Sequence, residues 1–364
     1  MKILDKYIIK KFLGTFGFML ILLTTIVLVI DVQEKVPRIE TSGYTVTYFL
    51  IHYYPFYIVY LLVTFIAILV FISVIFFTSR IANNTEIVAI ISSGASFHRF
   101  ARPYLITSTL IAVVFLIISH FVLPWANIKK NVLDAYTYSE VNKEKFLGNV
   151  SITTQLSPDE YIFINSYNKK EKRGSGFSYQ KYDKNKKLIY QLSASDVAWK
   201  PKKNNFELNS FLEKTVLKND TEILKDGSTR NISFGHPPEE LFPDQLLGQN
   251  KTTPELLQFI KREREKGNGN LNTYLNELHQ RTSMPVSIVI LTFLALSLSS
   301  EKKRGGLGIN LAIGISLAFV FVFSFEALKV VSENKTLIPF VAMWLPNMVF
   351  GPLAAILYFR RANQ

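Results

Sequence analysis

Six apolar stretches divide the chain into two groups of three, separated by a long polar insert. Each is close to the roughly 20 helical residues that cross a hydrocarbon core about 30 Å thick. The stretches are Phe12–Ile30, Tyr57–Phe77, Tyr104–Leu123, Met284–Ser300, Leu307–Val331 and Leu337–Tyr358. The pattern predicts a polytopic α-helical membrane protein with helices in residues 1–123 and 271–364 and an inserted domain at 124–270.

The insert is typical of β-structure, because short β-branched or aromatic runs alternate with turn residues. The predicted strands are Ser151–Gln155, Tyr161–Asn165, Phe177–Tyr182, Leu188–Leu192, Val197–Trp199, Phe206–Leu208, Glu222–Leu224 and Asn231–Phe234. Asp226-Gly227 predicts a hairpin turn between the last two runs. We therefore expect an all-β domain, either a sandwich or a jelly roll, closed or open along one side.

Two helices are predicted between the strands and the fourth apolar stretch. Thr252 and Glu255 have the spacing of a capping box, and Pro254 suits the first turn of a helix. A second helix starts near Asn270 and continues past Arg281 and Pro285 into the fourth stretch. The insert and the bundle should then be rigidly linked.

The net charge of +13 is distributed in a way that favours a membrane over a nucleic-acid partner. Basic residues gather before the first stretch, in the second and fourth connections and after the sixth stretch, while the other short connections are nearly neutral. The basic residues are Lys2, Lys6, Lys10, Lys11, Arg80, Arg99, Arg102, Lys302, Lys303, Arg304, Arg360 and Arg361. This alternation predicts that both termini are cytoplasmic and that the insert lies outside. The first run is too long for a typical signal peptide and lacks a small-residue cleavage site, so we expect a helix.

A short amphipathic helix is predicted at about residues 83–94, between the second and third stretches. Asn or Thr can cap it, Glu86 suits its first turn, and Gly94 suits its end. One interpretation is an interfacial helix that only joins two spans. The other is a docking element for a cytoplasmic partner.

No motif for chemistry is recognisable. The chain contains no G-x-x-x-x-G-K-[ST] phosphate loop, no H-E-x-x-H and no cysteine, and its five histidines are scattered singly. No nucleophile elbow is present either. We therefore expect no catalytic residue, no metal site and no cofactor, and no ATP binding through a phosphate loop.

Two charges fall within the outer third of the fifth stretch. Glu326 and Lys329 are spaced i and i+3, which allows a local ion pair with the lysine reaching toward the headgroups. The alternative is a cationic site for an anionic lipid.

Taken in order, several motifs resemble one family. They are Leu4-Asp5-Lys6-Tyr7-Ile8, Thr85-Glu86-Ile87-Val88-Ala89-Ile90 with Ser93-Gly94, Arg281 with Pro285, Lys302–Gly306, and Trp344-Leu345-Pro346-Asn347. Together with the strand-rich insert, they are similar over the whole chain to the LptF/LptG (YjgP/YjgQ) lipopolysaccharide-export permeases. The start is slightly more similar to LptG.

The resemblance implies a permease subunit of an ABC transporter that takes lipopolysaccharide from the bacterial inner membrane. It implies an LptB-like cytoplasmic ATPase dimer, a second permease (a paralogue or an identical copy) and LptC/LptA-like periplasmic proteins that receive the lipid from a periplasmic jelly roll. It assigns ATPase coupling to Glu86, Ile87, Ile90 and Gly94 in the 83–94 helix. Lys35, Arg38 and Lys329 become candidate contacts for lipid phosphates. One departure is that Asp31 and Glu34 stand beside Lys35 and Arg38.

Other functions remain open from the residues alone. A non-transporting scaffold would use the bundle as an anchor and the β-domain to bind a periplasmic partner. A permease of the lipoprotein-release type usually has four spans, and an intramembrane enzyme would need catalytic residues that the sequence does not display.

Overall fold

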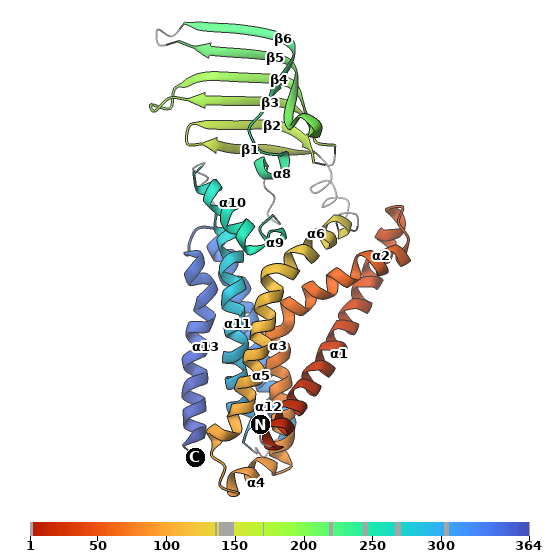
Figure 1. The fold of residues 1–364 in the computed structure, drawn as a ribbon, viewed down its shortest axis with the longest axis vertical. Coiled ribbons are helices and arrows are strands. Elements are labelled where there is room, and N and C mark those ends of the chain that lie inside the picture. The colour runs from red at the N-terminus through yellow and green to blue at the C-terminus, as the bar shows by residue number, and fades with distance from the viewer. Residues whose placement is uncertain are drawn as a thin grey trace.

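The protein, described by a computed structural model, folds into a helical bundle topped by a β-sheet (Figure 1). The structure describes residues 3–134, 137, 149–169, 171–217, 221–242, 247–265, 271–301 and 306–363. Within these ranges six helical segments are long and apolar enough to cross a membrane. They are α1 (Ile3–Thr41), α3 (Tyr54–Asn83), the continuous segment Phe97–Asp134, α11 (Asn272–Ser299), α12 (Gly306–Glu333) and α13 (Pro339–Ala362). The predicted three-plus-three arrangement is confirmed.

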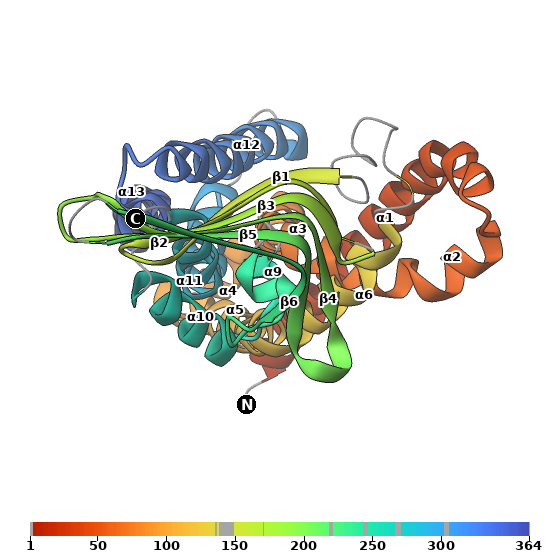
Figure 2. The ribbon, with the colours of Figure 1, turned by 90° about the horizontal axis from the view of Figure 1, so that it is seen from above.

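The two ends of the bundle differ. The sheet lies beyond one end, which we call the sheet end, and both termini lie at the opposite, terminal end (Figure 1). Helix α1 starts against the bundle at the terminal end and leans away toward the sheet end, where α2 (Val46–His52) turns the chain back into α3. Viewed from above, α1 and α2 project to one side of the molecule (Figure 2).

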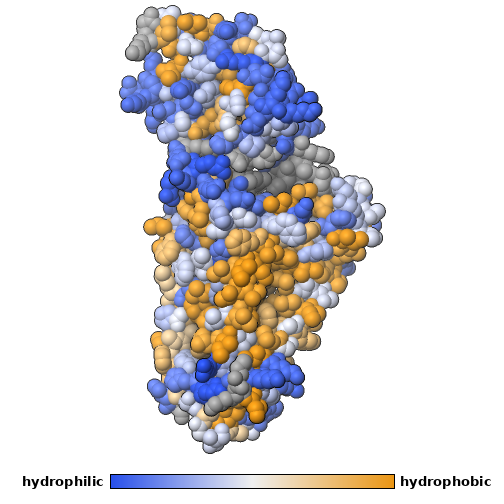
Figure 3. Space-filling model, viewed as in Figure 1, coloured by the Kyte–Doolittle hydropathy of each residue, from blue (hydrophilic) through white to orange (hydrophobic). Residues whose placement is uncertain are grey.

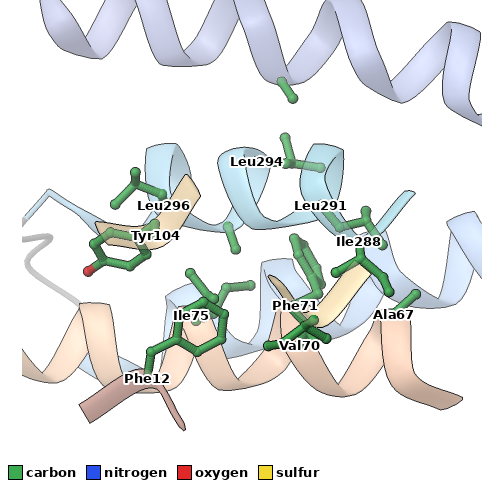
Figure 4. Close-up of a cluster of buried hydrophobic side chains, with 14 of the residues drawn as sticks. Phe12, Ala67, Val70, Phe71, Ile75, Tyr104, Ile288, Leu291, Leu294 and Leu296 are labelled. Atoms are coloured by element: carbon green, nitrogen blue, oxygen red, sulfur yellow. The ribbon is translucent and has the colours of Figure 1, made fainter. Parts of the chain in front are cut away.

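Tightly packed apolar side chains hold the bundle together. Val70, Phe71 and Ile75 of α3 are almost fully buried, as are Ile288, Leu291 and Leu294 of α11 (Figure 4). Near the terminal end, Phe12 of α1 stacks on Phe77, and Phe77 stacks on Tyr104 with ring centroids 5.3 Å apart. Helix α1 therefore joins this core through its first turns.

The third span contains a local widening. Helix α5 (Phe97–Ile117) passes into a π-helical turn, η1 (Ile118–Val122), and then into α6 (Leu123–Asp134). Pro124 has no N–H and its ring would collide with the carbonyl four residues earlier in an ideal α-helix. The π turn accommodates Pro124 without interrupting the helix.

The insert forms one six-stranded antiparallel sheet in the order β1-β2-β3-β4-β5-β6. The strands are β1 (Asn149–Ser157), β2 (Glu160–Asn168), β3 (Arg173–Tyr182), β4 (Leu188–Lys200), β5 (Asn205–Val216) and β6 (Glu222–Ile232). The all-β prediction is confirmed, and the strands form a single curved layer with β1 and β6 as its edges (Figure 2).

Two local predictions within the sheet are wrong. The runs Leu188–Leu192 and Val197–Trp199 belong to one strand, β4. Asp226-Gly227 is not a turn, because Gly227 lies inside β6 opposite Phe211 of β5. A Cβ at residue 227 would stand 2.6 Å from Cε1 of the Phe211 ring, so glycine leaves room for this ring.

One face of the sheet is covered by the segment that follows β6. Ile162, Ile164, Leu192 and Leu208 are buried on this face. Phe234, together with Leu241 and Phe242 at the end of the short helix α8 (Pro238–Leu241), packs onto them. We call residues 234–242 the cover segment. Thr154 of β1 holds it by donating a hydrogen bond to the carbonyl of Leu241 at 2.9 Å.

The connection back to the bundle is helical, as predicted. Helix α10 (Thr253–Glu265) starts with one half of the expected capping box: Thr252 N donates to Glu255 Oε2 at 2.8 Å, and the Thr252 hydroxyl donates to the same oxygen at 2.7 Å. Helix α11 continues without a break from Asn272 to Ser299. Phe259 of α10 packs edge-on against Tyr274 of α11, which fixes the two helices to each other.

The surface of the bundle is strongly apolar between its ends (Figure 3). The most apolar 18-residue windows of α1 and α12 are 0% and 22% buried, against 61% for α11. On α12 the exposed rings of Phe319 and Phe323 stack on each other. Helices α1 and α12 therefore present the largest apolar faces that the single chain leaves uncovered.

Candidate functional site

The predicted 83–94 helix is shorter than expected and has two different faces. Helix α4 (Glu86–Ser92) lies at the terminal end of the bundle (Figure 1). Ile87 is buried in the bundle core and Ile90 packs against it. Val88 is 58% exposed, and Ile91 is exposed beside it. The inner face anchors α4, and the outer face leaves apolar side chains free to meet another surface.

The backbone on either side of α4 makes sharp turns. Thr85 has φ +62° and its side chain makes no capping hydrogen bond, so the expected side-chain cap is absent. Gly94 has φ +89°, a conformation that suits glycine. These turns orient α4 across the ends of α3 and α5.

Helix α1 contacts this region through two polar interactions. Tyr7 Oη donates to Glu86 Oε2 at 2.8 Å, while Asn84 Nδ2 donates to Glu86 Oε1 at 3.2 Å. Two residues before Tyr7 in α1, Asp5 accepts hydrogen bonds from both terminal guanidinium nitrogens of Arg99 in α5, including Nη2 to Oδ2 at 2.9 Å. The start of α1 is therefore joined both to α4 and to the start of α5.

A second group of charges ties α1 to the bundle at the sheet end. Lys35 Nζ lies 3.2 Å from Asp31 Oδ1 and 3.0 Å from Asp134 Oδ1 of α6. Its side chain is 14% exposed and its charge also lies 4.4 Å from the centre of the Tyr53 ring. Lys130 pairs with the other oxygen of Asp134 at 3.5 Å. We call Asp31, Lys35, Tyr53, Lys130 and Asp134 the outer charge cluster.

The other two predicted cations are less engaged. Arg38 is 42% exposed, lies 3.7 Å from Glu34 and donates to the carbonyl of Thr137 at 3.3 Å. Lys329 is half-buried, and no carboxylate of the described residues lies within 4.0 Å of its ammonium group. The expected ion pair between Glu326 and Lys329 is therefore not formed in this part of the chain.

Arg281 joins the sheet end of α11 to the elements that lead from the sheet. Its side chain is buried and pairs with Glu277 at 2.9 Å. It also donates to Thr253 Oγ1 at 3.0 Å and to the carbonyl of Gly248 in α9 (Leu247–Asn250) at 3.1 Å. Arg281 is thus fully engaged in holding α9 and α10 on α11.

The predicted residues form two groups at opposite ends of the bundle. Glu86, Ile87, Ile90 and Gly94 lie at the terminal end, whereas Lys35, Arg38 and Lys329 lie toward the sheet end. Helix α1 runs between the ends and has contacts in both places. Sequence reasoning did not assign roles to Tyr7, Arg99, Tyr53 or Asp134. Tyr7 lies within a motif that supported the resemblance, but its partner is 79 residues away, so no local spacing could have identified it.

Comparison with known proteins supports the resemblance over nearly the whole chain. The model of the family "Lipopolysaccharide export system permease LptF/LptG" matches residues 6–360. It covers both LptF and LptG, so the similarity of the start to LptG stays a prediction. A search of curated proteins gave no match. This match spans both helical groups and the sheet between them, and the chain belongs to the LptF/LptG family of lipopolysaccharide export permeases.

Proposed function

We propose that the chain is one permease subunit of an ABC transporter that extracts lipopolysaccharide from the inner membrane and passes it to a periplasmic protein bridge. Family membership supports the export role. The observation that carries the finer assignment is Glu86, held by Tyr7 beside the exposed Val88 and Ile91 of α4. An acidic residue next to an apolar face suits docking onto a separate ATPase.

The orientation follows from the charges at the two ends of the bundle. The helix ends on the terminal side carry many basic residues, namely Lys6, Lys10, Lys11, Arg80, Arg102, Arg360 and Arg361. Cytoplasmic loops are rich in such residues. The terminal end, with both termini and α4, is then cytoplasmic, and the sheet is periplasmic.

The uncovered faces of α1 and α12 supply the lipid route and the contact with a second permease, which is a paralogue or an identical copy. Lipid tails and a partner helix both satisfy such apolar faces. We infer that the glycolipid enters between α1 of one permease and α12 of its mate. Its phosphates then meet Arg38 and Lys329, whereas Lys35 reaches a phosphate only by leaving Asp134.

The sheet continues the route toward LptC- and LptA-like periplasmic proteins. Its buried face is apolar, which suits acyl chains, and its edge strands β1 and β6 carry backbone groups that can pair with another sheet. The cover segment occupies that face, so Phe234 and Phe242 must move before an acyl chain can lie there.

The test uses Glu86→Ala and Glu86→Lys in the complex reconstituted in proteoliposomes. We expect lipopolysaccharide release per ATP hydrolysed to fall at least about tenfold, because a hydrogen-bonded charge is removed from the docking face. Glu171→Ala, in an exposed turn of the sheet domain, is the matched control.

Co-purification of the ATPase with each variant is measured in parallel. Unchanged ATPase binding together with unchanged release in both Glu86 variants would contradict the coupling role. A wild-type chain that retains a periplasmic partner but never an ATPase would instead support the scaffold.

A further inference from the structure

A cavity of about 200 Å³ lies within the bundle of the single chain, near its sheet end. It is lined by residues of α3, α5, η1, α6, α9, α11 and α12. None of its lining residues comes from α1. The cavity is therefore separate from the uncovered face of α1, and a single chain forms all of its walls.

The lining changes from polar to apolar with depth. Lys329 lines the cavity near the sheet end of α12, and Phe321 lines it two turns deeper, about 12 Å along the helix. Helix α11 shows the same order, with Glu277 and Arg281 above Met284. Phe115, Ala67 and Ile68 complete the apolar floor. A cavity with this gradient suits an amphiphile rather than water alone, because apolar cavities tend to stay dry.

One buried polar atom in the lining lacks a hydrogen-bond partner among the described residues. Asn127 of α6 is 2% exposed, and its Nδ2 donates to the carbonyl of Gln249 at 3.2 Å. Its Oδ1 is buried and accepts no hydrogen bond from the described residues. Because buried acceptors are nearly always paired, this oxygen calls for a donor that enters the cavity.

A cation also lines the cavity. Lys329 lines the cavity and has no carboxylate of the described residues within 4.0 Å, although Glu326 also contributes to the rim. Arg281 is less available than Lys329 to bind a ligand, because its guanidinium already binds Glu277, Thr253 and Gly248. Besides the carboxylate of Glu326, the rim thus offers an ammonium group with no carboxylate of the described residues within 4.0 Å, and the amide acceptor of Asn127, above an apolar floor.

We propose that this cavity binds a single-chain anionic amphiphile, with its alkyl chain between α3 and α12. A hydroxyl of the headgroup donates to Asn127 Oδ1, and its anionic group meets Lys329. The volume lies below the roughly 300–1,000 Å³ of pockets for drug-sized ligands, so the cavity holds part of one alkyl chain rather than several chains. The site shares Lys329 with the proposed lipid route, but it needs neither an ATPase nor a second permease and can be tested without them.

The experiment uses the full chain in nanodiscs and mass spectrometry of retained ligand. The probes are palmitoyl-lysophosphatidylglycerol, neutral monopalmitoylglycerol and inorganic phosphate. We expect retention to decrease in that order, with none for phosphate. Lys329→Gln should weaken binding of the anionic probe at least about tenfold and leave the neutral probe unchanged. Lys335→Gln, in the exposed turn after α12, is the matched control.

Two further variants test the cavity itself. Ala67→Phe fills the apolar floor and should abolish retention of both lipids. Asn127→Leu keeps the branched shape of the side chain, removes the acceptor together with the hydrogen bond to Gln249, and should weaken binding of both hydroxyl-bearing probes. This variant is the deciding test if Ala67→Phe does not fold. Undiminished retention in folded Ala67→Phe or in Asn127→Leu, or retention of phosphate alone, would overturn the proposal. If lipopolysaccharide displaces the probe, the natural occupant is an acyl chain of the glycolipid. If lipopolysaccharide does not displace it, the natural occupant is a free lipid.

Discussion

The hydroxyl of Tyr7 donates a hydrogen bond to Glu86 Oε2 across 2.8 Å, which joins the first turns of α1 to the first turn of α4. The same helix α1 carries Lys35 of the outer charge cluster almost eight turns later. One continuous helix therefore contacts both the proposed ATPase-docking element and the region where the lipid is proposed to enter.

Tyr7→Phe should weaken coupling without removing the acid. Losing one partly exposed hydrogen bond costs about 0.5–1.5 kcal/mol, so we expect release of lipopolysaccharide per ATP to fall about twofold to tenfold. Tyr48→Phe, at the exposed face of α2, is the control and should have no effect. A Tyr7→Phe complex with full release per ATP would show that the hydroxyl does not hold Glu86 for coupling.

Lys35→Met should destabilise the chain by about 3–5 kcal/mol, because it leaves Asp31 and Asp134, each with a side chain only 14% exposed, with Lys130 alone to balance them. The measurement is the thermal midpoint in detergent. Adding Asp134→Asn should recover part of the loss. Arg38→Ala serves as the comparison, and its exposed pair with Glu34 should contribute under about 1 kcal/mol. Equal losses for Lys35→Met and Arg38→Ala would contradict a structural role for the cluster.

The sheet domain should lose stability in acid through Glu213 of β5. The Tyr190 hydroxyl donates to this carboxylate at 2.8 Å, and Arg230 pairs with it. The hydrogen bond from Tyr190, followed by the Arg230 interaction, holds the pKa of Glu213 below its usual value of 4.5. A lowered pKa in the folded state means that the stabilisation is present above pH 4.5 and disappears as the pH falls through the lowered value.

Trp199 in the sheet core provides the readout, once Trp125 and Trp344 are replaced by Phe. Glu213→Gln should remove this part of the acid dependence and cost under about 1 kcal/mol at neutral pH. If the unfolding midpoint of Glu213→Gln still followed the parent curve between neutral pH and pH 3, the assignment would fail.

Two glycines of the sheet should differ in their tolerance of a methyl group. At Gly174 a Cβ would lie 2.7 Å from the backbone oxygen of Ser166, which cannot move aside without disturbing the sheet. At Gly227 the obstacle is the Phe211 ring, which can rotate away. We expect Gly174→Ala to cost about 1–3 kcal/mol and Gly227→Ala clearly less. The Trp199 unfolding curve measures both, and the reverse order would contradict this explanation.

The sequence was most informative where structure depends on composition over many residues. The six apolar spans, the β-rich insert and the unbroken α11 all follow from patterns that tertiary contacts do not change. The capping box at Thr252 and Glu255 is equally local, and its hydrogen bond is present.

Prediction failed where a distant contact decides the local conformation. Asp226-Gly227 has the composition of a hairpin turn, yet the ring of Phe211 on the neighbouring strand occupies the space beside Gly227 and β6 runs straight past it. Likewise, the site partners Tyr7 and Glu86 are 79 residues apart, and Lys35 and Asp134 are 99 apart. Folding alone brings such pairs together, so no spacing rule could find them.

The unbroken helix α11 has a mechanical consequence. Its 28 residues span about 42 Å, and Arg281 fastens α9 and α10 to its sheet end. Such a helix acts as a lever arm, because a tilt of about 5° at the Ser299 end displaces the Asn272 end by about 4 Å. Small rotations of α11 would therefore displace its sheet end by several ångströms, which is enough to break or form contacts at the base of the sheet.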